Sequence, residues 1–306
     1  MMPMKLDVIS ILDLQDDLED VIASAMRLKG GALKNAFPLK GKTLAMIFEK
    51  SSTRTRVSFE AGMAQLGGHA LNLSPKELQL GRGETIADTA KVLSRFVDCI
   101  MYRAFDHKMM LELAENSTVP VINALDDVEH PCQTVADLMT VLERKKRFGG
   151  VKMAYVGDGN NVCNSLMLGA AIVGLDFVAA NPKGYGPDGT LAKKAKAMAK
   201  KKGSSLELVT DPKAAVKGAD VIYTDTWVSM GMEEEAKERM KVFQPYQVNS
   251  ALVRLAKRDC IVMHCLPAHR GQEITDEVMD GGNSAVFDQA ENRMHTEKAI
   301  LLMLIR

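Results

Sequence analysis

The chain has 306 residues, of which 46% are hydrophobic and 25% are charged, and its 39 basic residues equal its 39 acidic ones. This composition is typical of a globular protein with a substantial core, and the length is typical of two domains. A net charge of zero argues against a broad nucleic-acid-binding or anionic-membrane surface, so any anion must be bound locally by a few arginines. Five cysteines without a C-x-x-C pair argue against a disulfide framework and against a structural zinc site.

The first residues lack the charged-then-apolar layout of a secretory signal. The longest apolar runs, such as residues 299 to 305, fall far short of the ~20 residues that span a membrane. We therefore expect a cytoplasmic protein with no membrane or nucleic-acid partner.

In the first half of the chain, short apolar runs bounded by turn residues alternate with stretches of helical periodicity. Strands are predicted at residues 43–48, 69–73, 98–103 and 119–123. Helices are predicted at residues 13–28, 54–66, 85–96, 107–116 and 131–148. Because strands and helices alternate, we expect an α/β fold with a mainly parallel sheet flanked by helices on both faces.

The second half repeats this alternation after a basic helix end and two glycines at 149 and 150. Strands are predicted at residues 151–156, 175–180, 206–209, 220–224 and 261–263. Helices are predicted at residues 162–173, 190–202, 212–217, 233–241 and from 288 to 305. The expected domains are therefore residues 1–148, completed by the C-terminal helix 289–306, and residues 149–288, so that two interdomain helices link them.

Three consecutive hydroxyl residues and two arginines follow the first strand, where Ser51, Ser52 and Thr53 suit the cap of the next helix. Arg54 and Arg56 do not suit this place, because cations near a helix N-terminus oppose the helix dipole by up to about 1 kcal/mol each. Amides, hydroxyls and guanidinium groups at the carboxyl end of a strand are typical of a phosphate site. The alternative is a capped helix with two solvated arginines.

Every candidate cluster lies just after a predicted strand. The clusters are Ser52 to Arg56, Arg103, His130 to Gln133, Asn161, Asp225 to Met230, and His264 to Leu266. Ligands of open parallel sheets bind outside the carboxyl ends of the strands, so we expect these clusters to face one cleft.

The turn Gly157-Asp158-Gly159 is similar to the start of a dinucleotide fingerprint. Val162 stands in place of the third glycine, however, and no acidic residue ends the next strand. We therefore interpret the turn as a helix N-terminus that offers Asn161 to a polar substrate.

His264, Cys265 and His269 are candidates for metal ligands, and Cys265 is a candidate nucleophile. A histidine on a strand is more often a structural core residue, and nothing in the nearby sequence marks a base that would activate Cys265. We expect no bound metal.

Four motifs together resemble the ornithine carbamoyltransferases of the aspartate/ornithine carbamoyltransferase family. They are Ser52-Thr-Arg-Thr-Arg56, His130-Pro-x-Gln133, Asp225-x-x-x-Ser229-Met230-Gly231 and His264-Cys-Leu-Pro267. The likeness runs essentially end to end. The first two motifs are shared by carbamoyltransferases in general, whereas the last two separate the ornithine enzymes from the aspartate enzymes.

The resemblance implies the roles of individual residues. Carbamoyl phosphate would be held by Ser52, Thr53, Arg54, Thr55, Gln79 from the neighbouring subunit, Arg103, His130, Gln133, Cys265, Leu266 and Arg293. Ornithine would be held by Asn161, Asp225, Ser229 and Met230. The groups nearest the reaction would be Arg103, His130, Gln133, Asp225 and Cys265.

The implied reaction transfers a carbamoyl group from carbamoyl phosphate to the side-chain amine of L-ornithine, in arginine metabolism, without a cofactor. We expect Asp225 and Cys265 to orient and tune the amine; whether either accepts a proton stays open. The family forms trimers, so a homotrimer or a multiple of trimers is expected. The alternatives are transfer to another amine such as putrescine, a nucleotide-binding oxidoreductase, and a non-catalytic binding subunit.

Overall fold

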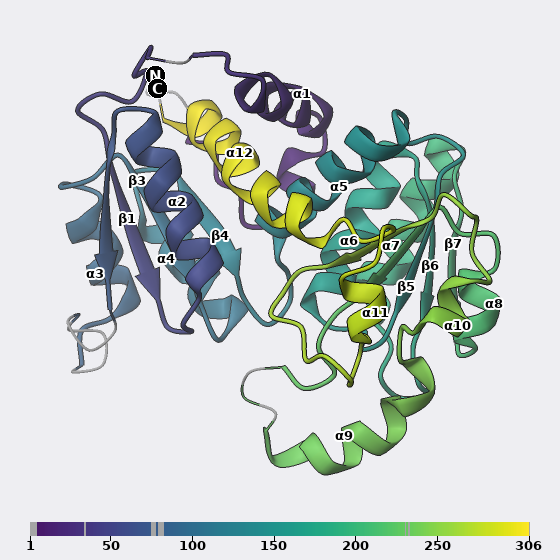
Figure 1. The fold of residues 1–306 in the computed structure, drawn as a ribbon. Coiled ribbons are helices and arrows are strands. Elements are labelled where there is room, and N and C mark those ends of the chain that lie inside the picture. Colours follow the sequence, from purple (N-terminus) through teal and green to yellow (C-terminus); the bar gives the residue numbers. More distant parts are fainter. Residues whose placement is uncertain are drawn as a thin grey trace. The chain divides into compact units, whose positions relative to one another are not determined.

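The structure is a computed structural model that describes residues 5–33, 35–74, 78, 83–229, 231 and 233–305. The chain forms two compact units, of which the first comprises Met1–Ala136 with Asn292–Arg306 and the second Asp137–Glu291. Both divisions fall inside helices, namely α5 (Pro131–Lys145) and α12 (Val286–Leu304). Figure 1 shows the elements of each unit.

The first unit contains a parallel sheet with the strand order β2-β1-β3-β4. Its strands are β1 (Thr43–Phe48), β2 (His69–Leu73), β3 (Cys99–Arg103) and β4 (Val121–Leu125). Its helices are the 3-10 turn η1 (Ile11–Leu14), α1 (Leu18–Lys29), α2 (Thr53–Gln65), α3 (Ile86–Leu93) and α4 (His107–Asn116). Helices α3 and α4 pack on one face of the sheet, and α2 lies over the other (Figure 1).

The second unit contains a parallel sheet with the strand order β7-β6-β5-β8-β9. Its strands are β5 (Lys152–Val156), β6 (Asp176–Ala180), β7 (Leu206–Val209), β8 (Val221–Thr224) and β9 (Ile261–His264). Its helices are α6 (Asn161–Val173), α7 (Gly189–Lys202), α8 (Pro212–Val216), η3 (Glu233–Glu235), α9 (Ala236–Phe243), η4 (Gln244–Tyr246), α10 (Ser250–Val253) and α11 (Asp276–Met279). Helices α8, α10 and α11 share one core cluster with the sheet, and α6 packs with α7.

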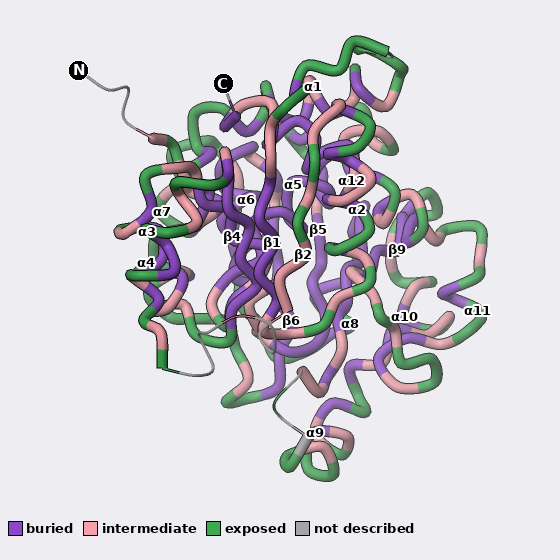
Figure 2. Tube along the Cα trace, turned by 90° about the vertical axis from the view of Figure 1, so that its left-hand side faces the viewer, coloured by how far each residue is buried: buried purple, intermediate pink, exposed green. Residues whose placement is uncertain are grey.

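Burial explains why these segments fold as they do. Apart from the edge strands β2 and β7, the strands of both sheets are largely buried (Figure 2), as expected for parallel strands covered on both faces. Helix α6 is apolar nearly all round and is buried from Val162 to Val173. The Ala/Lys-rich α7 instead buries one narrow stripe of alanines at positions 192, 195 and 199. Among the described residues, no helix combines the length and the hydropathy that a membrane crossing requires.

The prediction of parallel sheets flanked by helices is confirmed, with small differences at the ends of elements. The helix expected from residue 13 begins at Leu18, because Ser10 caps a separate 3-10 turn with its hydroxyl and Asp13. The helix expected at 233–241 starts as the 3-10 turn η3 and continues as α9. Helices α10 and α11 were not predicted, since four residues are too few to show a helical period.

Candidate active site

The segment after β1 begins α2, as its hydroxyl residues predicted. Ser52 is the N-cap, and its hydroxyl accepts a hydrogen bond from the backbone N–H of Thr55 at 3.3 Å. The two arginines differ in their surroundings. Arg56 is exposed and pairs with Glu60 on the same helix at 3.1 Å, whereas Arg54 is half-buried. Of the two, therefore, Arg54 is the better placed to bind an anion, and Arg56 braces the helix surface.

A buried guanidinium gathers residues that lie far apart in the sequence. Arg293 on α12 donates to Gln133 Oε1 on α5 at 2.7 Å and to Thr55 Oγ1 on α2 at 3.1 Å. All three side chains are at least 98% buried. The fold of the first unit thus brings together three residues that the sequence assigned to one ligand.

His130 immediately precedes α5 and is buried, as is Arg103 at the end of β3. Burial and the positive charges of Arg293, Arg103 and Arg54 together hold the pKa of His130 well below its usual value. The imidazole is therefore neutral at physiological pH and can donate one ring N–H without adding positive charge. A neutral donor among three cations suits a carbonyl oxygen next to a phosphate group.

Lys50 is a further cation of this region that the sequence analysis missed. Burial, and then the charge of Arg103, lowers the pKa of its amine, and the ammonium lies 4.8 Å from the centre of the Phe105 ring. A lysine directly before three hydroxyl residues was a usable signal, although the hydroxyls and arginines were the stronger one.

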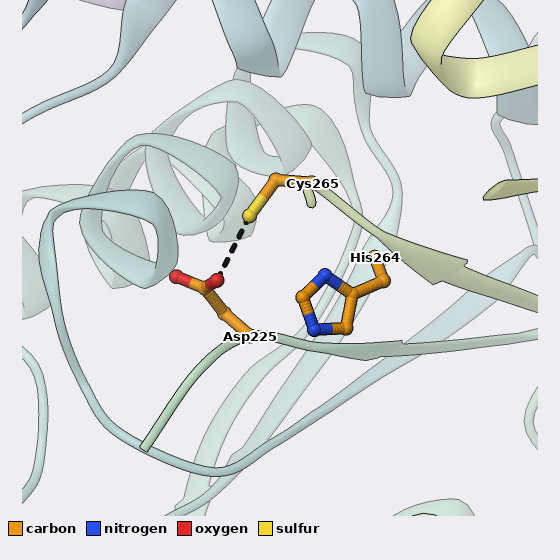
Figure 3. A group of neighbouring side chains, drawn as sticks. All are labelled: Asp225, His264 and Cys265. Atoms are coloured by element: carbon orange, nitrogen blue, oxygen red, sulfur yellow. Dashed lines mark hydrogen bonds between the residues drawn. The ribbon is translucent and has the colours of Figure 1, made fainter. Parts of the chain in front are cut away.

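In the second unit, Asp225 is the centre of a polar cluster at the end of β8 (Figure 3). The thiol of Cys265 donates to Asp225 Oδ1 at 2.9 Å, and Asn160 Nδ2 donates to Asp225 Oδ2 at 2.7 Å. The backbone N–H of Thr226 also donates to Oδ1, at 2.8 Å. The carboxylate is therefore held in one orientation by three donors.

The structure describes two of the other residues predicted to bind ornithine, Asn161 and Ser229. Asn161 is the first residue of α6, and its Oδ1 lies 3.0 Å from the backbone N–H of Val162. Ser229 is half-buried in the loop after Asp225. Met230 and Gln79 lie outside the described residues.

Asn160, which the sequence analysis did not single out, caps α6 and at the same time binds Asp225. Its Oδ1 accepts from the backbone N–H groups of Val162 and Cys163, so its amide nitrogen points at the carboxylate. The preference of asparagine for N-cap positions was the available signal.

A buried ion pair holds the loop that follows Asp225. Arg239 on α9 pairs with Asp158 and donates to the backbone oxygen of Trp227 at 2.6 Å. The guanidinium also lies 5.0 Å from the Tyr185 ring centre. Burial raises the pKa of Asp158 to about 6, with Arg239 opposing this shift. The pair fixes the backbone midway between Asp225 and Ser229.

A second buried carboxyl supports the turn after β9. Leu266 has a φ of 61°, a left-handed conformation that is unfavourable for leucine. Its N–H donates to His264 Nδ1 at 2.9 Å, so the ring proton lies on Nε2, which donates to Glu273 Oε1 at 3.1 Å. The same oxygen accepts from the backbone N–H of His269 at 2.5 Å. Glu273 therefore stabilises the conformation that presents Cys265 and Leu266.

Replacing Glu273 by alanine is expected to lower the free energy of unfolding by about 3 kcal/mol, because it leaves the buried Nε2–H of His264 and the partly buried N–H of His269 without an acceptor. Glu273→Gln should cost much less, since its amide oxygen can accept at the same place. Chemical denaturation of both variants measures the difference. A fully stable Glu273→Ala protein would show that the turn does not depend on this carboxyl.

Asp225, His264 and Cys265 also offer ligand atoms within 4.8 Å of one another, a spacing that could suit a metal ion (Figure 3). Their atoms are already engaged, however. His264 uses one ring nitrogen for Leu266 and the other for Glu273, and the thiol proton of Cys265 is shared with Asp225. A metal ion would have to break these contacts, so the donor set favours an orienting role for these residues.

The space beside the glycine turn after β5 is occupied by other parts of the chain, so the turn does not form an open phosphate-binding loop. A Cβ atom at Gly159 would lie 2.2 Å from the backbone of Gly186 and Pro187. Gly159 is thus needed for the close approach of the chain after β6. This packing speaks against a dinucleotide site at the turn.

Comparison with known proteins matches both halves of the chain to one family. Residues 6–143 match the aspartate/ornithine carbamoyltransferase carbamoyl-P binding domain, and residues 149–304 match the Asp/Orn binding domain of the same family. A catabolic ornithine carbamoyltransferase of Thermoplasma volcanium is 56% identical over 98% of this chain and 99% of its own length. An anabolic ornithine carbamoyltransferase of Pyrococcus furiosus is 60% identical over 87% of this chain and 85% of its own.

Among solved structures, the ornithine carbamoyltransferase from Pyrococcus furiosus superposes with a TM-score of 0.93. It has 54% sequence identity, and the match covers 99% of each chain.

Proposed function

Because the chain belongs to the aspartate/ornithine carbamoyltransferase family, we propose that it transfers the carbamoyl group of carbamoyl phosphate to the side-chain amine of L-ornithine, giving L-citrulline and phosphate. The observation that carries the choice of ornithine is the hydrogen bond between Cys265 and Asp225. It joins the two motifs that separate ornithine enzymes from aspartate enzymes, although they lie 40 residues apart in the sequence.

Carbamoyl phosphate binds to the first unit in this proposal. Ser52, Thr53 and the guanidinium groups of Arg54 and Arg103 hold the phosphate at the N-terminus of α2, where open amides and charge-assisted hydrogen bonds favour an anion. This placement explains why a cation is tolerated in the first turn of that helix.

The carbamoyl group would lie beside the buried trio of Thr55, Gln133 and Arg293. Thr55, Arg103 and the neutral His130 donate to its carbonyl oxygen, and Gln133 accepts from its amide. Donors already aimed at an oxygen that gains negative charge lower the barrier, typically by ~3–4 kcal/mol for a single donor.

Ornithine binds to the second unit through Asn161, Asp225, Ser229 and Met230. Its side-chain amine has a lysine-like pKa near ~10.4, so presenting it neutral at pH 7 costs about 4.6 kcal/mol. A partly dry pocket reduces this cost, because burial disfavours the charged ammonium. Asp225 and Cys265 orient the amine, and the leaving phosphate takes the last proton. No covalent intermediate and no cofactor is required.

The assembly is proposed to be a homotrimer or a multiple of trimers, with Gln79 of each copy reaching the neighbouring site. A cytoplasmic location is also proposed. It is supported by the five cysteines, which are all free thiols, four of them fully buried, as is usual in a reducing compartment.

The direct test is citrulline formation by the purified protein from carbamoyl phosphate and ornithine. Putrescine and aspartate serve as matched acceptors, because putrescine lacks the carboxylate and α-ammonium that the second unit would bind. Turnover with ornithine at least a hundredfold above both is expected. Preference for putrescine or aspartate would contradict the assignment of ornithine as the acceptor. NADH binding in a titration would instead support the alternative of a nucleotide-binding oxidoreductase.

A further inference from the structure

A fully buried carboxyl group lies behind the carbamoyl-phosphate residues of the first unit. Glu297 is one turn after Arg293 on α12, and both side chains are almost completely buried. Its Oε1 accepts from Arg293 Nη2 at 2.7 Å and from Nε at 3.1 Å. The other oxygen, Oε2, has no hydrogen-bond partner among the described residues.

The groups that face this carboxyl cannot easily supply a donor. Ser58 on α2 is close enough to Glu297 for a hydrogen bond that would lower the pKa of the carboxyl, but its hydroxyl proton is directed at the backbone oxygen of Arg54 at 2.7 Å, which leaves Oε2 without a donor in the described part of the chain. On α5, the thiol of Cys132 donates to the backbone oxygen of Asn123 at 3.4 Å. Among the described residues, the charged group that pairs with Glu297 is Arg293.

On the same helix, the neighbouring cation Lys298 donates to Gln65 at 2.8 Å and is thereby engaged with α2. Gln133 on α5 accepts from Arg293 and so shares the guanidinium with Glu297.

An ionised carboxylate with one unpaired oxygen is costly in a buried site. Burial accordingly raises the pKa of Glu297 to about 7, although Arg293 opposes the shift. Protonation of Glu297 does not require its hydrogen bonds to Arg293 to break. Its carbonyl oxygen still accepts from Arg293, and its hydroxyl can donate to a lone pair of Ser58 Oγ.

We propose that Glu297 takes up a proton from solvent when carbamoyl phosphate binds, and that this uptake sets the affinity for the substrate. The inference rests on the proposed function of the first unit. While ionised, Glu297 offsets the charge of Arg293 and repels the incoming dianion. Once protonated, it leaves Arg293 in place with its full charge. The bound dianion in turn favours the protonated carboxyl, as linkage requires.

The test is calorimetric titration of the wild-type protein with carbamoyl phosphate at pH 7.5, in two buffers that differ in ionisation enthalpy. If binding raises the pKa of Glu297 by about one unit, the protein takes up about half a proton per site. Between pH 6.5 and 8.5, the dissociation constant of the wild-type protein should rise several-fold relative to that of Glu297→Gln.

Glu297→Gln has the shape of the protonated form and retains every other titration, including that of the ligand. The ratio of the two dissociation constants therefore isolates Glu297. Glu60→Gln is the matched control, since it removes the same charge from the outer face of α2, and it should leave the pH dependence unchanged.

A ratio that stays constant with pH, or wild-type binding with no proton uptake, would overturn the proposal. The uptake measurement needs no variant, so an absence of uptake overturns the proposal even if Glu297→Gln does not fold. Binding with uptake in a protein that makes no citrulline would contradict only the proposed function, whereas an active protein without uptake contradicts only the role of Glu297.

Discussion

Replacing Arg54 by alanine is expected to lower kcat/KM for carbamoyl phosphate about a thousandfold without unfolding the protein. A charge-assisted contact to a phosphate group is among the strongest that a side chain makes, and a loss of about 4 kcal/mol corresponds to this factor. Stability should stay the same or rise slightly, because Arg54 stands in the first turn of α2, where a cation opposes the helix dipole.

Arg56→Ala is the control for this prediction. Arg56 carries the same charge on the same helix, but it is exposed and paired with Glu60. Surface pairs of this kind contribute at most about 1 kcal/mol, so steady-state kinetics should change little. Equal losses in the two variants would mean that the total charge of the segment matters and not the place of Arg54.

The parallel sheets were predictable from the sequence because each strand is a short apolar run and each helix has a clear period. The family was predictable as well, and the matches over residues 6–143 and 149–304 confirm it. Periodicity failed at the four-residue helices α10 and α11, which are held by packing in the core of the second unit.

The residues that would touch the substrates stood out because their types are unusual for their positions, as with the arginines after β1. Their buried partners did not stand out. Glu297 and Glu273 look like ordinary surface glutamates in the sequence. The i,i+4 spacing places Glu297 beside Arg293 on a helix, but only the fold buries that pair and puts Glu273 against His264. Asp158 and Arg239 likewise pair across 81 residues, a separation that no local pattern reveals.

The two buried carboxyl groups Glu297 and Asp158 share one electrostatic feature. Each is paired with an arginine, and each still has a raised pKa because burial outweighs that pairing. For an acid of this kind, folding favours the protonated form, so its contribution to stability falls as pH rises from the unfolded pKa through the folded one. Near neutral pH, each carboxyl therefore contributes less to stability than at low pH, while it still orients the guanidinium of its arginine partner.

Replacing Asp225 by asparagine is expected to lower kcat/KM for ornithine about a thousandfold, with a small change in KM for carbamoyl phosphate. The substitution removes the negative charge that would attract the cationic substrate. In the wild-type protein, Asn160 and Cys265 each donate to one of the two oxygens of Asp225. Asparagine has an amide nitrogen in place of one of these oxygens, so one of the two donors would lose its acceptor. Because unpaired buried donors cost about 1–3 kcal/mol each, the loop should lose its fixed orientation.

Two further variants distinguish an orienting role of the Asp225 carboxylate from covalent catalysis by the Cys265 thiol. Cys265→Ser keeps a donor for the carboxylate, so an orienting role predicts a loss of about tenfold or less, whereas a nucleophilic thiol predicts near-complete inactivation. Asn160→Ala removes the second donor but keeps the charge, and it should raise KM for ornithine more than it lowers kcat. Steady-state kinetics with each substrate varied in turn distinguishes these cases. If Asp225→Asn retained the wild-type KM for ornithine and Cys265→Ser were inactive, the acceptor amine would not be oriented by this carboxylate, and a covalent step at Cys265 would have to replace it.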